Sequence, residues 1–176
     1  MALDIGIIGW VHTIACIIAL ISGFILLWKL KGGDVHKRLG GNYVIASVIA
    51  NITALAIYKI GGFTLFHILA LATLISLIIA FVSARWKIPG QFWLRVHLTA
   101  IIFSYYQLVG GLINEVFLRV PGLKEKTAAI SNFQGLALVF FLMLIAYFGG
   151  KTSRSLIQAT SVRPRANINH PKISGL

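Results

Sequence analysis

Long apolar stretches separated by short polar segments make up most of this chain. Five of them are long enough to cross a bilayer, and they lie at about residues 7–28, 38–58, 64–84, 93–114 and 133–150. Each predicts a transmembrane helix, because about 20 apolar residues span the roughly 30 Å of hydrocarbon in a membrane. The pattern therefore predicts an all-α integral membrane protein, an up-down bundle over residues 1–150 with a four-helix core and a fifth helix.

The composition agrees with a membrane protein, and the placement of charge predicts its orientation. Hydrophobic residues make up 58% of the chain and charged residues 11%. The mean hydropathy of +0.88 lies outside the range of soluble domains. Twelve of the 16 basic residues would lie on one side of the bundle, and the side richer in Lys and Arg is usually cytoplasmic. The N-terminus is therefore predicted outside, and the C-terminus, with a basic tail over residues 151–176, in the cytoplasm.

Several classes of function are excluded by what the chain contains. The net charge of +12 needs no nucleic acid to explain it, because the basic residues flank the apolar runs and form no recognition motif. Cys16 is the single cysteine, so the chain has no intrachain disulfide and no Cys-x-x-Cys-His motif for covalent haem. No arrangement typical of hydrolytic or phosphoryl-transfer enzymes is present either.

Small and polar residues recur on one face of three of the predicted helices. Positions three, four and seven apart share a helix face, and a face of this kind turns to the interior of a membrane bundle. These faces carry His12, Ala15, Ala19 and Gly23 in the first run, His36, Gly40, Tyr43, Ser47, Asn51 and Ala54 in the second, and His97, Ser104, Gly111 and Glu115 in the fourth, with Gln107 and Asn114 at its edge. In the third run the candidate face is apolar, with Leu71, Leu74 and Ile78 following His67.

Four of the five histidines lie near the starts of the first four runs, at His12, His36, His67 and His97. In an up-down bundle His12 and His67 fall near the outer face, and the other two fall near the inner face. Ionisable groups at membrane depth are functional candidates, although a histidine near a helix end also serves as a structural residue that reaches interfacial water. With a rise of about 1.5 Å per residue, the two histidine layers would lie roughly 15–20 Å apart.

This pairing predicts a cofactor site. A six-coordinate b-type haem takes one imidazole nitrogen from each of two facing helices, and small residues make room for the ring. Its carboxylates prefer basic partners. The basic residues available are Lys37, Arg38, Arg85 and Arg95 on the inner side, and Lys59 and Arg119 on the outer side. Each of these has the alternative role of a basic residue that snorkels to the membrane surface.

One histidine on each of four consecutive helices, paired between helices two apart, resembles the layout of the small ascorbate-reducible and superoxide-oxidising transmembrane cytochromes b. The resemblance covers about residues 7–115. It implies electron transfer through two haems b, the outer held by His12 and His67 and the inner by His36 and His97, with a quinone or a small one-electron carrier as partner. The fifth run has no place in that pairing.

A second resemblance is closer in sequence. Residues 33–40, Gly-Asp-Val-His-Lys-Arg-Leu-Gly, followed by Tyr43, are similar to a His-Arg-x-x-Gly-x-x-Tyr signature in a family of small prokaryotic membrane proteins of unknown function. Arg95-x-His97 and Glu115-x-x-x-Arg119 are similar to the fourth helix of that family. The resemblance covers about residues 10–120 and implies a polytopic protein of the bacterial inner membrane.

Two other interpretations stay open. His12, His67 and Glu115 would form a two-histidine, one-carboxylate set for a transition metal, in a metal-binding or transport protein. Glu115 and Arg119 are also spaced as a local i,i+4 ion pair. The third interpretation is a cofactor-free accessory subunit that associates with a second copy or a partner through the fifth helix.

Overall fold

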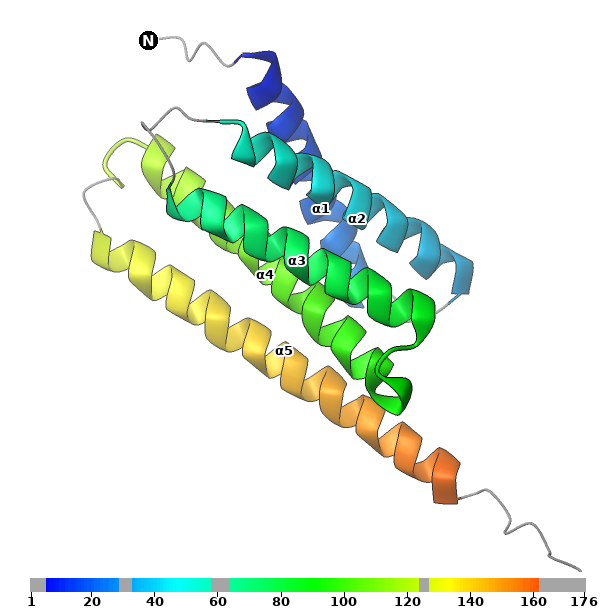
Figure 1. Cartoon of the computed structure of the whole chain (residues 1–176). Helices are drawn as coiled ribbons and strands as arrows, with labels where there is room; N and C mark the ends of the chain where they lie inside the picture. The colour runs from blue at the N-terminus through cyan, green and yellow to red at the C-terminus, as the bar shows by residue number, and fades with distance from the viewer. Residues whose placement is uncertain (1–5, 29–32, 58–63, 124–126, 162–176) are drawn as a thin grey trace, which may run out of the picture.

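The fold is described by a computed structural model, which covers residues 6–28, 33–57, 64–123 and 127–161. All regular secondary structure in these ranges is helical. The elements are α1 (Ile7–Trp28), α2 (Gly33–Leu55), α3 (Leu65–Trp86), the short 3₁₀ helix η1 (Gly90–Phe92), α4 (Trp93–Arg119) and α5 (Thr127–Ser161). Successive α-helices run in opposite directions (Figure 1), which confirms the predicted all-α, up-down bundle.

Two helical hairpins form the four-helix core. α1 packs along α2, α3 packs along α4, and the hairpins meet where α2 contacts α3 and α1 contacts α4. Between the described parts of α1 and α3, and of α2 and α4, the backbones do not come into contact. The four helices therefore occupy successive corners of a square, with α1 and α3 on one diagonal and α2 and α4 on the other.

The centre of this core is built from small and aromatic residues. Tyr43 of α2 and Tyr105 of α4 meet edge to face with their ring centroids 6.1 Å apart. Both rings pack against the backbone of α1 at Gly23, where an added Cβ would lie 2.5 Å from the Tyr105 ring and 3.1 Å from the Tyr43 ring. A glycine is therefore required at this position for close approach of the helices.

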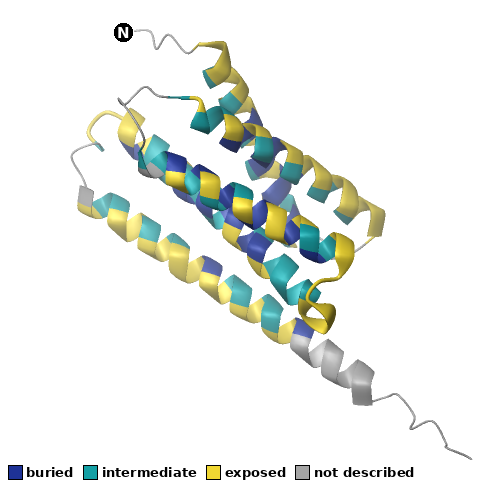
Figure 2. Ribbon diagram, in the orientation of Figure 1, coloured by how far each residue is buried: buried dark blue, intermediate teal, exposed yellow. Residues whose placement is uncertain are grey.

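The fifth α-helix is a peripheral element. Among the described elements, α5 packs against α4 alone, and Figure 2 shows exposed residues along most of its length. Large apolar side chains such as Leu136, Met143 and Tyr147 are more than half exposed. An exposed apolar surface of this kind suits contact with lipid.

Four of the described helical segments are long and apolar enough to cross a membrane: Ile7–Trp28, Phe66–Trp86, Gly90–Arg119 and Ala128–Thr152. The predicted second span, α2, is long enough at 23 residues but more polar. Its polar residues Ser47 and Asn51 are buried, whereas Ile45, Ile49 and Ile52 point outward. This distribution places α2 in the bundle with its polar face turned inward.

Several helix boundaries differ from the prediction. α2 begins at Gly33, where the predicted run begins at residue 38. α4 continues to Arg119 and α5 begins at Thr127, so the predicted loop over residues 115–132 shortens to the segment between these helices. α5 also continues to Ser161, into the segment predicted as a tail. The prediction ended each helix with its apolar run, but a helix that leaves the lipid need not end there. Residues 58–63, between α2 and α3, and the rest of the tail, with His170, lie outside the described residues.

Candidate functional site

The structure places the four candidate histidines at two ends of the core. His12 and His67 lie in the first two turns of α1 and α3, which both start at one end of the bundle, called here the His12 end. His36 and His97 lie in the first two turns of α2 and α4, which start at the opposite end, called here the His97 end.

His12 is oriented by the neighbouring helix of its own hairpin. Its Nδ1 lies 2.8 Å from the carbonyl oxygen of Ala50 and 3.2 Å from the Thr53 hydroxyl. That hydroxyl donates to the same Ala50 carbonyl at 2.9 Å. A carbonyl oxygen only accepts, so Nδ1 carries the proton and a neutral ring has a bare Nε2. The thiol of Cys16 lies 3.5 Å from this Nε2 and can donate to it.

His97 repeats this arrangement at the other end and in the other hairpin. Its Nδ1 lies 2.9 Å from the carbonyl oxygen of Ala80 in α3. The Ser83 hydroxyl donates to the same carbonyl at 3.0 Å, three residues along α3, as Thr53 does in α2. The Nε2 of a neutral His97 is therefore also bare. Histidines that bind metals are typically held in this way, with one nitrogen donating to a carbonyl and the other free to ligate.

His67 has the opposite arrangement of protons. The backbone N–H of Thr64 donates to His67 Nδ1 at 3.1 Å, and the Thr64 hydroxyl lies 2.9 Å from the same nitrogen. The two residues form a capping box at the start of α3. Because Nδ1 accepts a hydrogen bond, the proton of a neutral ring lies on Nε2. In this arrangement neither nitrogen of His67 offers a free lone pair to a metal ion.

A hydrogen bond deep in the core fixes how α2 and α4 face each other. The Tyr43 and Ser104 hydroxyl oxygens are 2.7 Å apart. Ser104 donates to the Ile101 carbonyl, so the Tyr43 hydroxyl is the donor of this pair. His36 lies seven residues before Tyr43, and His97 lies seven residues before Ser104. Seven residues are close to two turns, about 10 Å, and both helices run the same way, so His36 and His97 lie at one level on facing sides of α2 and α4.

The histidines of the His12 end also share a level. Tyr105 of α4 donates to the Leu20 carbonyl of α1 at 3.0 Å, and Thr73 of α3 donates to Gln107 of α4 at 3.1 Å. His12 precedes Leu20 by eight residues. Gln107 lies two residues beyond Tyr105 toward the His12 end, and His67 lies six residues from Thr73 in the same direction. His67 is therefore roughly 12 Å from the level of Leu20, at about the same height as His12.

The two histidine layers are about 20 Å apart along the helix axes. His12 bonds to Ala50, 14 residues beyond His36, and His97 bonds to Ala80, 13 residues beyond His67. Both hairpins therefore give the same separation, at the upper end of the predicted range.

The interior face of α3 differs from the prediction. Leu71 and Ile78 are 42% and 61% exposed, so they point away from the core. The buried polar residues of α3 are His67, Thr73, Ser76 and Ser83. The prediction counted helical turns from His67, but lipid receives apolar residues on the outside of a membrane bundle, and small and polar residues turn inward. The positions of Thr73, Ser76 and Ser83 would have predicted the interior face of α3 correctly.

The predicted basic and acidic partners are at the ends of the bundle. Arg38 is exposed on α2, and Arg95 is partly buried on α4 with its guanidinium carbon 5.7 Å from the centroid of the Phe92 ring. Glu115 forms an ion pair with Arg119. Within the described part of the chain, no three His, Cys, Asp or Glu side chains are grouped so as to hold a metal ion. The structure thus does not assemble His12, His67 and Glu115 into one site.

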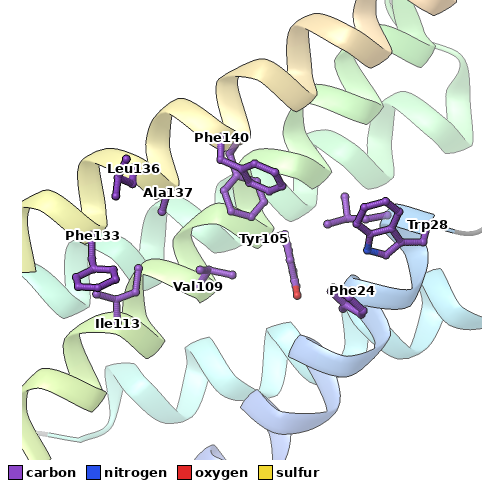
Figure 3. Close-up of a pocket in the computed structure, with 11 residues that line it drawn as sticks. Phe24, Trp28, Tyr105, Val109, Ile113, Phe133, Leu136, Ala137 and Phe140 are labelled. Carbon is purple, nitrogen blue, oxygen red and sulfur yellow. The ribbon is translucent and has the colours of Figure 1, made fainter.

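A separate apolar groove of about 430 Å³ lies between α1, α4 and α5 (Figure 3). Its lining residues are Phe24, Leu27, Trp28, Tyr105, Val109, Ile113, Phe133, Leu136, Ala137, Phe140 and Phe141. Phe24, Trp28 and Phe133 are largely exposed on the outside of the bundle, so the groove opens toward lipid. None of the four candidate histidines lines it.

Comparison with known proteins identifies a family. Residues 9–149 match the family model described as "Predicted membrane protein (DUF2306)". The match runs from the start of α1 into the membrane part of α5, so the fifth helix belongs to the conserved unit. No curated protein and no solved structure matches the chain.

Proposed function

The chain belongs to the DUF2306 family of predicted membrane proteins, and from the geometry of its histidines we propose that it binds b-type haem and transfers electrons within the membrane. The proposal goes beyond the family description, which names a membrane protein only. The observation that carries it is the register of α2 and α4, which sets His36 opposite His97. We place the protein in the cytoplasmic membrane of a bacterium, with the His97 end inside.

The residues at the His97 end fit a six-coordinate haem. His97 is held with its Nε2 bare by the bond from Nδ1 to the Ala80 carbonyl. His36 lies at the same level on the facing helix, and the small residues Gly40 and Ala100 lie one turn further along α2 and α4. A Cβ added at Gly40 would meet nothing within 4 Å. These residues would hold the iron and leave room beside it for the flat ring.

The residues at the His12 end do not fit a second haem as they are placed. His12 has the required bare Nε2, but His67 uses its Nδ1 to cap α3 and keeps its proton on Nε2. The second haem predicted from the sequence would need His67 to leave Thr64. We therefore propose one haem, at the His97 end, and no role in electron transfer for His12 and His67.

A bound haem would supply a reversible one-electron centre whose potential is set by its two imidazole ligands and their surroundings. The chain's own residues set those surroundings. The Ala80 carbonyl orients His97 and enriches its ring in electrons. Arg38 and Arg95, each two residues from a histidine of this pair, would pair with the haem carboxylates at the membrane surface.

The electron partner that best suits the structure is a quinone. The groove between α1, α4 and α5 is lined by apolar side chains, and its one phenol, Tyr105, already donates to the Leu20 carbonyl. A long apolar chain from the bilayer suits such a lining, and the isoprenoid tail of a quinone is of that kind. Trp28 marks the end of this groove closest to the His97 end.

The test is the visible spectrum of the purified protein, expressed with a haem supply. We expect a reduced-minus-oxidised spectrum of b-type haem and about one haem per chain by pyridine haemochrome analysis. Close to two haems per chain would show that His67 leaves its cap. A colourless protein under good haem supply would overturn the proposal, and bound metal or its absence would then separate a metal-binding protein from an accessory subunit.

A further inference from the structure

Buried polar side chains follow the axis of the four-helix core from one histidine layer to the other. This polar seam, as we call it, comprises Tyr43, Ser47 and Asn51 of α2, Thr73, Ser76 and Ser83 of α3, and Ser104 and Gln107 of α4, all at most 9% exposed. Polar groups in the middle of a membrane are unfavourable unless they are paired, and they often mark the path of an ion or a proton.

Part of the seam is already linked across helices. Tyr43 donates to Ser104 between α2 and α4, and Thr73 donates to Gln107 between α3 and α4. At the two ends of the seam the hydroxyls of Thr53 and Ser83 lie on the same carbonyls as His12 and His97. The hydroxyls therefore extend from one histidine layer to the other.

Two buried polar atoms in the middle of the seam have no hydrogen-bond partner in the described structure: Ser47 Oγ and Gln107 Nε2. Their residues are 1% and 5% exposed. Ser47 lies four residues after Tyr43, and Gln107 lies three residues after Ser104, so both are one turn beyond the Tyr43–Ser104 bond. The two orphaned groups therefore lie at about one level of the core, on α2 and α4.

A water molecule is the ligand that these atoms suit. The amide N–H of Gln107 donates, and the Ser47 hydroxyl donates or accepts, so together they provide the polar partners that a buried water needs. Ser47 also lies beside the Tyr43 hydroxyl. A water at this position would add a link between α2 and α4 one turn beyond the Tyr43–Ser104 bond.

We propose that water bound between Ser47 and Gln107 forms part of a proton path along the polar seam. A proton that enters from one side is taken up by the water, which releases one of its own protons to the next hydroxyl. Each hydroxyl accepts one proton and gives up one, so no group changes its net protonation and no electron moves. The water site lies about three turns, roughly 15 Å, along the helices from His36 and His97, and the path does not depend on haem binding.

The test measures proton entry into phosphatidylcholine vesicles that contain the purified full-length chain and a pH-sensitive dye, driven by a potassium gradient with valinomycin. We expect entry to be at least tenfold faster than in empty vesicles. The double variant Ser47→Ala with Gln107→Leu should fall to the rate of empty vesicles, because it removes both water partners. Ser22→Ala is the matched control, since Ser22 is buried on α1 outside the seam and bonds within its own helix.

A wild-type rate equal to that of empty vesicles would overturn the proposal, and so would an unchanged rate in the double variant. The variant Ser47→Thr retains the hydroxyl and should keep most of the wild-type rate. It distinguishes loss of the water site from a folding defect caused by substitution at this position. Loss of the rate in Ser47→Thr or in Ser22→Ala, with both chains monodisperse and helical, would also contradict the proposal. Haem-free and haem-loaded protein should conduct alike, so failure here is distinguishable from failure of haem binding.

Discussion

The two ends of the four-helix core carry the same residue type at similar helix positions, but the histidines at each end behave differently. At the His97 end, Nδ1 of His97 donates to a carbonyl, and its partner His36 faces it across α2 and α4. At the His12 end, His12 is held in the same way, whereas His67 accepts from a backbone N–H and caps its own helix. The neighbour of Nδ1 therefore decides which nitrogen is bare, and position near a helix start does not.

The largest expected effect is on haem binding. We predict that His97→Ala and His36→Ala each lower the haem content by roughly tenfold or more, because each removes an axial ligand. His67→Ala should leave the haem content unchanged, because its ring is a cap. Pyridine haemochrome analysis of the purified variants measures this. Loss of haem in His67→Ala with retention in His97→Ala would reverse the assignment of the two ends.

The fold was largely predictable from the sequence, because the lengths of the apolar runs and the short segments between them predict the helices and their up-down order. The interior faces of α1, α2 and α4 were predicted correctly, with Ala19, Tyr43 and Ser104 all buried. The face of α3 was wrong because the prediction followed the helical period from His67 to Leu71 and Ile78, and lipid takes such apolar residues on the outside of the bundle. Its hydroxyl residues would have given the correct side.

The candidate site was only partly predictable. The spacing of the histidines predicts their division between two ends, but it contains no information about which nitrogen holds a proton. The capping role of His67 did have a signal, since Thr64-x-x-His67 places a side-chain acceptor where a capping box usually has Glu or Gln. The seven-residue offsets from His36 to Tyr43 and from His97 to Ser104 were also visible, but their meaning required the hydrogen bond that joins α2 and α4.

The second prediction concerns the packing that supports the His97 end. Gly23→Ala should lower the free energy of unfolding by about 1–3 kcal/mol, because the new methyl group would overlap the Tyr105 ring and press on Tyr43. Since Tyr43 sets the register of α2 and α4, the haem content should fall as well. Unfolding in detergent, followed by circular dichroism, measures the stability.

Gly41→Ala is the matched control for this substitution. Gly41 is exposed on α2 and its Cβ would meet nothing within 4 Å. Alanine in a helix interior is favoured over glycine by up to about 1 kcal/mol, so this variant should be at least as stable as the wild type. If Gly23→Ala were as stable as Gly41→Ala, the close approach of α1 to the two tyrosines would be wrong.

The third prediction separates a capping histidine from a ligating one. His67→Ala should lower the free energy of unfolding by about 1 kcal/mol, since it leaves the Thr64 N–H without its acceptor. His67→Gln should restore most of this loss, because a glutamine side chain at this position accepts the same bond. The pair is compared by thermal unfolding in detergent. A glutamine variant as unstable as the alanine variant would argue against the cap.

The smallest effects should come from the two hydroxyls that share a carbonyl with a histidine. Ser83→Ala removes one of the two bonds to the Ala80 carbonyl, so that oxygen accepts more strongly from His97 Nδ1. A more electron-rich imidazole stabilises ferric iron, and the midpoint potential of the haem should fall slightly. Thr53→Val removes the corresponding hydroxyl beside His12, where no haem is proposed, and should leave the potential unchanged. Each variant should lose no more than about 1 kcal/mol of stability. A shift in potential from Thr53→Val and none from Ser83→Ala, in spectroelectrochemical titrations, would place the haem at the His12 end.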